Sequence, residues 1–147
     1  MTMKTTRLTA AILASLLPLP ALAHIHIAPE QARRGEPVEL ALIVGHGCAG
    51  AATTALRVAI PAGLSAEPLA QPGWQPVIGN GEVGWQGGPL PDHDKAQFIL
   101  RGTIAADAPE SIALPVVQVC GDKQVRWIEP GAQSESPAPV LQVLPAQ

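Results

Sequence analysis

The chain has 147 residues, of which twelve are acidic and nine are basic, so its formal net charge at neutral pH is −3. A net negative charge argues against nucleic acid and against anionic membranes as partners. The length is sufficient for a single domain with a hydrophobic core.

Residues 1–23 have the three parts of a signal peptide in the expected order. Lys4 and Arg7 form a basic start, an apolar run covers residues 8–17, and Ala21-Leu22-Ala23 matches the small-x-small cleavage pattern. The apolar run is shorter than the about 20 residues that span a bilayer. We therefore expect a cleaved signal, with an uncleaved anchor or a buried N-terminal helix as the alternative.

Cleavage between Ala23 and His24 leaves residues 24–147 as one domain. Its formal net charge is −5, because two basic residues and no acidic residue precede the cut. Both methionines leave with the signal, which removes the soft thioether ligands of Cu(I) sites. The mature chain is expected to be periplasmic or secreted and to lack a membrane anchor.

The residue that follows the cut, His24, carries two nitrogen ligands close together. An α-amine and an imidazole both offer lone pairs near neutral pH, so together they can close a chelate ring on a metal ion. Nitrogen ligands suit Cu(II), which tops the affinity order of the divalent first-row ions. The alternative is a histidine that processing leaves at a frayed end.

His26 is the third residue of the mature chain. A third-position histidine can bind Cu(II) or Ni(II) in a square plane with the amine and two deprotonated backbone amides. Ile25 and Ile27 alternate with the histidines, which predicts a strand whose pairing uses some of those amides. A strand would put His24 and His26 on one face, about 6.5 Å apart. The alternative for His26 is a surface-facing polar residue.

The rest of the chain predicts an all-β fold. Sixteen prolines and fourteen glycines are scattered along it, and short alternating runs are separated by turn signals, which is typical of a sandwich or barrel. About eight strands are expected, at residues 24–27, 38–42, 53–61, 81–86, 96–104, 111–120, 123–129 and 139–144. Turns are expected at residues 33–37, 71–76, 87–92 and 120–124. Pro115, inside one run, points to an edge strand or a bulge.

The two cysteines, Cys48 and Cys120, are interpreted as a disulfide because the chain is exported. A thiolate metal pair or a redox couple is the alternative, and the absence of a CxxC motif disfavours the couple. His46 precedes Cys48 in "GHGC" and is either a ligand, a partner of a ligand, or a turn histidine bonded to the backbone. His93, between two acidic residues, is predicted to be a solvated turn residue.

"VRWIE" (125–129) holds two further candidates. Trp127 is a core residue on the simplest interpretation, but near a Cu(II) ion an indole would exclude water and pack over the metal. Glu129 is either a carboxylate ligand or a salt-bridged edge residue. No grouping of Ser, His and Asp indicates a hydrolase, and no glycine pattern indicates a nucleotide site. No catalytic residue is therefore assigned.

Several motifs together resemble one family. They are "RGEPVELALIVGHGCAGAATTALRVAIPAG", "PGW", W-x-G-G-x-L-P at 85–91, and "PVVQVCGDKQVRWIEP". In this order, after an N-terminal histidine, they are similar to the YcnI-like copper-binding domain. The resemblance runs from His24 to about Val143, which is nearly all of the mature chain.

The resemblance implies an immunoglobulin- or cupredoxin-like β-sandwich of seven to nine strands that binds Cu(II). In that family the mature N-terminal histidine, here His24, supplies amine and ring nitrogens, and a tryptophan, here Trp127, lies close by. A carboxylate completes the set after the second main strand. This chain has no acid in the corresponding turn, where His46 stands as in the disulfide-containing "HGC" variant. His46 is the first choice for the third ligand, and Glu129 and His26 are the reserves.

These patterns predict an exported Cu(II)-binding protein, not an enzyme, that serves copper acquisition, delivery or tolerance. Its expected partners are the copper ion and other exported copper chaperones or a membrane copper transporter. The rivals are a copper monooxygenase-like enzyme, a CopC-type carrier, and a metal-free β-sandwich for interaction or adhesion. A monooxygenase needs a second histidine and usually a flat aromatic face, whereas this chain has no tyrosine.

Overall fold

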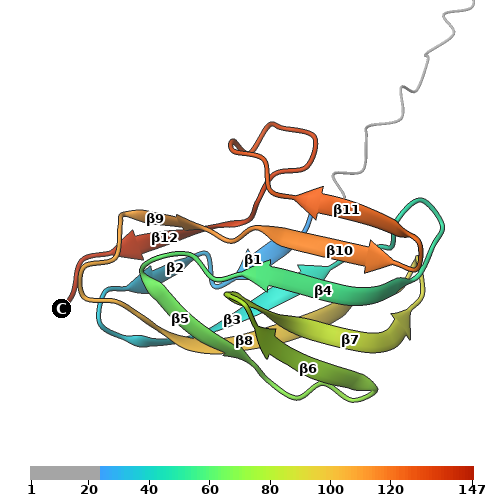
Figure 1. The fold of residues 1–147 in the computed structure, drawn as a ribbon. Helices are drawn as coiled ribbons and strands as arrows, with labels where there is room; N and C mark the ends of the chain where they lie inside the picture. Colours follow the sequence, from blue (N-terminus) through green and yellow to red (C-terminus); the bar gives the residue numbers. More distant parts are fainter. Residues whose placement is uncertain (1–23) are drawn as a thin grey trace, which may run out of the picture.

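The computed structural model describes residues 24–147, and the predicted signal peptide at 1–23 lies outside the described residues. The described residues form twelve strands and no helix (Figure 1). The strands are β1 (His26–Ala28), β2 (Gln31–Arg33), β3 (Pro37–Val44), β4 (Thr53–Ala59), β5 (Leu64–Pro68), β6 (Trp74–Gly79), β7 (Glu82–Leu90), β8 (Ala96–Ile104), β9 (Ser111–Ala113), β10 (Val116–Cys120), β11 (Lys123–Trp127) and β12 (Val140–Leu144). None of the described chain has the helical length and hydropathy that a bilayer crossing requires.

Two sheets form the body of the sandwich (Figure 1). One has the order β1-β3-β8-β5 and the other has the order β11-β10-β4-β7-β6. Their inner faces meet in a buried core, where the ring of Phe98 on β8 lies 5.3 Å from Trp85 on β7 and 4.9 Å from Trp74 on β6. Along β3 and β8, buried residues alternate with residues that are partly or fully exposed. This alternation is the period-two pattern from which the sequence predicted both strands.

A smaller sheet of order β2-β12-β9 closes one end of the sandwich, with β2 and β12 parallel and β9 antiparallel to β12. Strand β9 of this sheet and strand β10 of the five-stranded sheet both come from the single run expected at 111–120. Pro115 has no N–H for a sheet ladder, so pairing stops there. The chain pairs with β12 before the proline and with β4 after it. Pro115 therefore marks a change of sheet.

The all-β immunoglobulin-like sandwich is confirmed, but its twelve strands in the described residues exceed the seven to nine expected. Strands β2, β5 and β6 were not expected, and the run expected at 111–120 forms two strands, β9 and β10. Strands β2 and β9 have only three residues each, too few for a periodic pattern to be seen. The expected turn at 71–76 is confirmed in its first half, where Trp74 N–H donates to the Gln71 carbonyl at 3.0 Å, but β6 already begins at Trp74. The expected turn at 87–92 begins only after Leu90, because β7 continues through two glycines.

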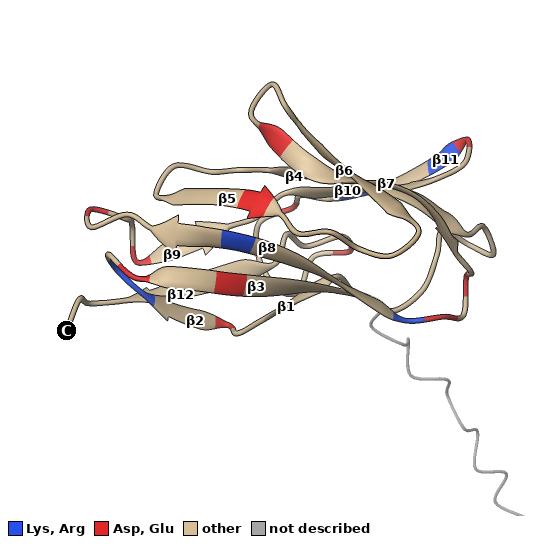
Figure 2. Cartoon of the chain, turned by 90° about the horizontal axis from the view of Figure 1, so that it is seen from below, with Lys and Arg blue, Asp and Glu red and all other residues tan. Residues whose placement is uncertain are grey.

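Charged residues are dispersed over the strands and turns in the view of Figure 2. Arg101 on β8 and Glu39 on β3 stand opposite each other in the sheet and form an ion pair of 2.8 Å. Both side chains are more than half exposed, so this pair is expected to add less than about 1 kcal/mol to stability.

The predicted disulfide between Cys48 and Cys120 is confirmed. It joins the turn after β3 to the end of β10, across 72 residues of sequence. Both half-cystines are buried. The bond therefore ties one sheet of the sandwich to the other at the end of the molecule where the histidines lie.

Candidate metal centre

His24 lies two residues before the start of β1, the edge strand that pairs with β3. Ile25 and Ile27 are buried in the core, which confirms the alternation expected from the sequence. His24 is half-buried and His26 is exposed on the same side, with their ring centroids 6.4 Å apart. This separation agrees with the about 6.5 Å expected for alternate residues of one strand.

Trp127 brings two of the histidines together. Its ring centroid is 5.9 Å from that of His24 and 6.5 Å from that of His46, both in edge-on orientations. Trp127 ends β11 and is only 4% exposed, so the indole belongs to the core and also faces the histidines. His24 and His46 are about 20 positions apart in sequence, and Trp127 follows His46 by about 80 positions. The fold thus places both histidines beside one aromatic ring.

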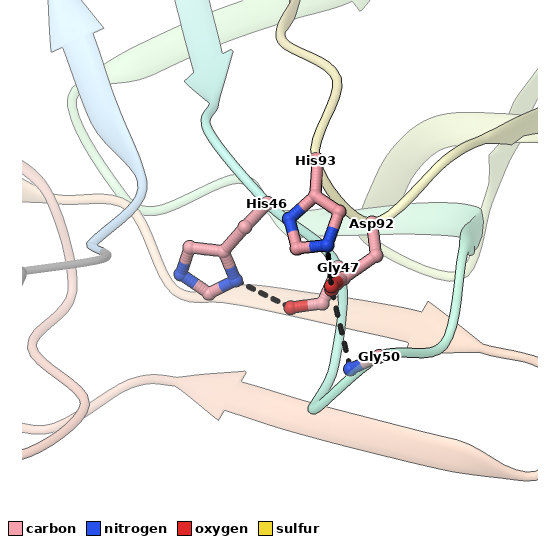
Figure 3. Close-up of polar contacts among 5 residues, drawn as sticks. All are labelled: His46, Gly47, Gly50, Asp92 and His93. Atoms are coloured by element: carbon pink, nitrogen blue, oxygen red, sulfur yellow. Dashed lines mark hydrogen bonds and ion pairs between the residues drawn. The ribbon is translucent and has the colours of Figure 1, made fainter.

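The ring of His46 is oriented by the backbone. Its Nδ1 contacts the carbonyl oxygen of Gly47, which can only accept a hydrogen bond, so Nδ1 carries the proton and donates it (Figure 3). In the neutral imidazole the lone pair is then on Nε2. Metal-binding histidines commonly have this arrangement, in which the second nitrogen donates to a carbonyl and sets the tautomer.

The turn that carries His46 is held by Asp92 (Figure 3). Gly47 N–H donates to the Asp92 backbone carbonyl at 3.0 Å, and Gly50 N–H donates to the Asp92 carboxylate at 3.3 Å. A side chain at Gly47 would collide with the Ala51 carbonyl, since a Cβ there would lie 1.9 Å from that oxygen. His93 is 95% exposed beside Asp92, in agreement with a solvated turn.

Residues 130–137 form a loop, called the arm below, and Glu129 joins the two ends of this loop by hydrogen bonds. Its carboxylate accepts a hydrogen bond from Ser136 N–H at 3.1 Å, and its backbone pairs with Ser136 and Ala138. These contacts are with backbone groups of the arm, whereas a salt bridge was the simpler expectation. The side chain is exposed, so a carboxylate ligand from this position would have to leave Ser136 first.

His24 and His26 line one open cleft of about 350 Å³ with Glu30 and the end of the arm. The arm contributes Ala132 and Pro137, and the segment that leads into β12 contributes Ala138, Pro139 and Val140. The backbone of β1 pairs with β3 from His26 onward. This pairing competes with the square-planar mode that would need the amides near His26.

The sequence interpretation missed Gln118, which is 1% exposed at the middle of β10. Its amide bonds to Trp127, Thr53 and the His46 carbonyl. The signal was present, because Gln118 occupies an inward position between Val116 and Cys120 in an alternating run. A polar side chain at an inward strand position must have buried partners.

Within residues 24–147, no group of three or more His, Cys, Asp or Glu side chains has a metal-binding arrangement. A histidine brace does not require one, because amine and ring nitrogens come from a single residue. His24 and His46, which both lie beside the Trp127 ring, offer nitrogen donors of the kind that Cu(II) prefers.

The family model described as "Domain of unknown function (DUF1775)" matches residues 24–83 and 77–143. No curated protein matches the chain. A solved structure of an uncharacterized protein from Nocardia farcinica, described as having an immunoglobulin-like fold, is similar at 25% identity with a TM-score of 0.71. The match covers 82% of this chain and 98% of that one. The family match spans His24, His46 and Trp127, and the solved structure agrees with the sandwich.

Proposed function

This chain belongs to the DUF1775 family, the YcnI-like family that its motifs resemble, and we propose that it is an exported Cu(II)-binding protein. The observation that carries the proposal is the meeting of His24 and His46 at the Trp127 ring. The disulfide supports an oxidising compartment, and hence the periplasm or the exterior, because such bonds persist there.

The proposed ligands are the α-amine and ring nitrogen of His24 and Nε2 of His46. His26 is a reserve because its ring centroid, 6.4 Å from that of His24, is at the far limit for two imidazoles on one ion. That limit is roughly 6 Å, since each metal–nitrogen bond is about 2 Å long. Glu129 is the other reserve, because its carboxylate already accepts the Ser136 N–H.

The role that fits this site is to bind the ion and pass it on. The buried indole of Trp127 excludes water from one side, while the cleft beside His24 leaves another side open to exchange. Copper is therefore cargo, received from or delivered to other exported chaperones or a membrane copper transporter. Copper acquisition, delivery and tolerance all use such a carrier.

The test is Cu(II) titration of protein that begins at His24, followed by electron paramagnetic resonance. We expect one tightly bound equivalent whose spectrum shows nitrogen coordination, and one coordinated nitrogen fewer in His46→Ala. A wild-type spectrum without nitrogen coordination would favour a metal-free interaction or adhesion domain. A copper monooxygenase-like enzyme would instead consume oxygen when supplied with reductant and polysaccharide, which the carrier is not expected to do.

Copper affinity is expected to fall with decreasing pH. The amine and both imidazoles must be unprotonated to bind the metal, so protons compete with copper. A free α-amine ordinarily has a pKa of about 8, so displacement of its proton alone is expected to weaken copper binding about tenfold between about pH 7 and pH 6. Competition with a chelator of known pH dependence measures the change. A constant affinity over this range would contradict nitrogen ligation.

A further inference from the structure

We propose that Gln118 is a positioning residue that holds His46 and Trp127 in place before copper arrives, an inference that rests on the proposed function. Its side chain is buried between the two sheets and touches neither the cleft nor the solvent. Gln118 and Thr53 are the buried polar residues of the described chain. Their position beside the candidate ligands requires a physical explanation.

The Gln118 amide makes three hydrogen bonds to residues around the site. Its Nε2 donates to the His46 carbonyl at 2.7 Å and to Thr53 Oγ1 at 2.8 Å. Its Oε1 accepts from the Trp127 indole N–H at 3.0 Å. No buried side-chain nitrogen or oxygen within residues 24–147 lacks a partner, so the polar group is compensated for its removal from water.

These partners impose a single orientation on the amide. The indole N–H can only donate and the His46 carbonyl can only accept. If the amide were turned over, its NH2 group would face the indole N–H and its oxygen would face the carbonyl. Both contacts would then be repulsive in a buried environment, where unpaired groups cost about 1–3 kcal/mol each. One residue thus determines the relative positions of Trp127 and the His46 backbone.

The disulfide supports the same arrangement from the other side. Cys48 follows His46 by two residues, and Cys120 follows Gln118 by two residues. The disulfide and the hydrogen bond from the Gln118 side chain to His46 therefore join the same two segments. Thr53 Oγ1 lies 3.8 Å from the Cys120 sulfur and completes the contact. The turn with His46 is therefore attached to β10 at two adjacent points, which reduces the ordering that copper binding must bring about.

The test uses Gln118→Leu, which keeps most of the volume but removes every hydrogen bond of the amide. We expect a folded, less stable protein that still binds Cu(II) through His24. Its paramagnetic resonance spectrum should show one coordinated nitrogen fewer, as His46→Ala does, and its affinity should fall about 10- to 100-fold, as for other partners of metal ligands.

The matched control is Thr53→Val, which removes a hydrogen bond from the same buried network but leaves the bond between Gln118 and His46. It should lose stability and keep the wild-type spectrum. Gln118→Met provides a second variant if the leucine protein does not fold, because it is unbranched, similar in volume to glutamine and lacks N–H groups for His46. It is expected to give the His46→Ala spectrum.

The outcomes separate the two proposals. A wild-type nitrogen count and affinity in both Gln118 variants, with one nitrogen lost in His46→Ala, would overturn the positioning role and leave the copper site standing. A wild-type spectrum in His46→Ala would also overturn it, because a different ligand would then complete the brace. A wild-type protein without nitrogen-coordinated copper would overturn the proposed function and, with it, this inference.

Discussion

Protein that begins one residue earlier, at Ala23, is expected to bind Cu(II) at least about a hundredfold more weakly than protein that begins at His24. The extra residue converts the His24 amine into a peptide nitrogen and moves the free amine out of reach of the same chelate ring. A hundredfold loss corresponds to about 2.7 kcal/mol, a reasonable cost for losing one nitrogen ligand and its ring. Competition with a chelator of known affinity measures it.

The control for this experiment is a chain that begins at His24 and carries one additional alanine after Gln147. It should bind copper like the protein that begins at His24, since the C-terminus lies away from β11, the strand that ends at Trp127 (Figure 1). Thermal unfolding of the two extended proteins without metal should be equal. Equal copper affinity for the Ala23 form and the mature form would refute the histidine brace.

Removal of the disulfide by the double substitution of Cys48 and Cys120 with alanine is expected to lower the free energy of unfolding by roughly 4 kcal/mol. The bond closes a 72-residue loop, and in the chain-entropy model a loop of this size restricts the unfolded chain by about that amount. Denaturant unfolding of the metal-free protein measures the loss.

Arg101→Ala is the matched control, because it breaks an exposed ion pair with Glu39 far from the disulfide. Its unfolding free energy should change by less than about 1 kcal/mol. The cysteine variant should also bind copper more weakly, since the turn that carries His46 loses one of its attachments to β10. A stability loss no greater than that of Arg101→Ala would show that the disulfide does not constrain the fold as argued.

Local periodicity was enough to predict much of this fold. Strand β8 has the bounds expected, at 96–104, because its inward residues alternate over nine positions. The pairing of the two cysteines followed from their number and from the predicted signal peptide. The shared face of His24 and His26 followed from the repeat of a β-strand, in which alternate residues point the same way.

Other features depended on partners distant in sequence. Pro115 limits pairing on its own, but only the surrounding strands decide that β9 joins β12 and β10 joins β4. Glu129 was ambiguous because a carboxylate suits a metal, a cation or a backbone N–H equally well. In the fold it accepts the N–H of Ser136, seven residues later in a loop without periodicity.

By itself, the sequence determined the class of fold, the disulfide and the chemistry available at His24, because each depends on residue type, spacing or a local repeat. Only the tertiary structure decided that His46 meets Trp127 and that Gln118 bonds to both. These contacts join the turn after β3 to β10 and β11, which are neighbours in the other sheet. They follow from how two sheets stack, which no pattern within a single strand encodes.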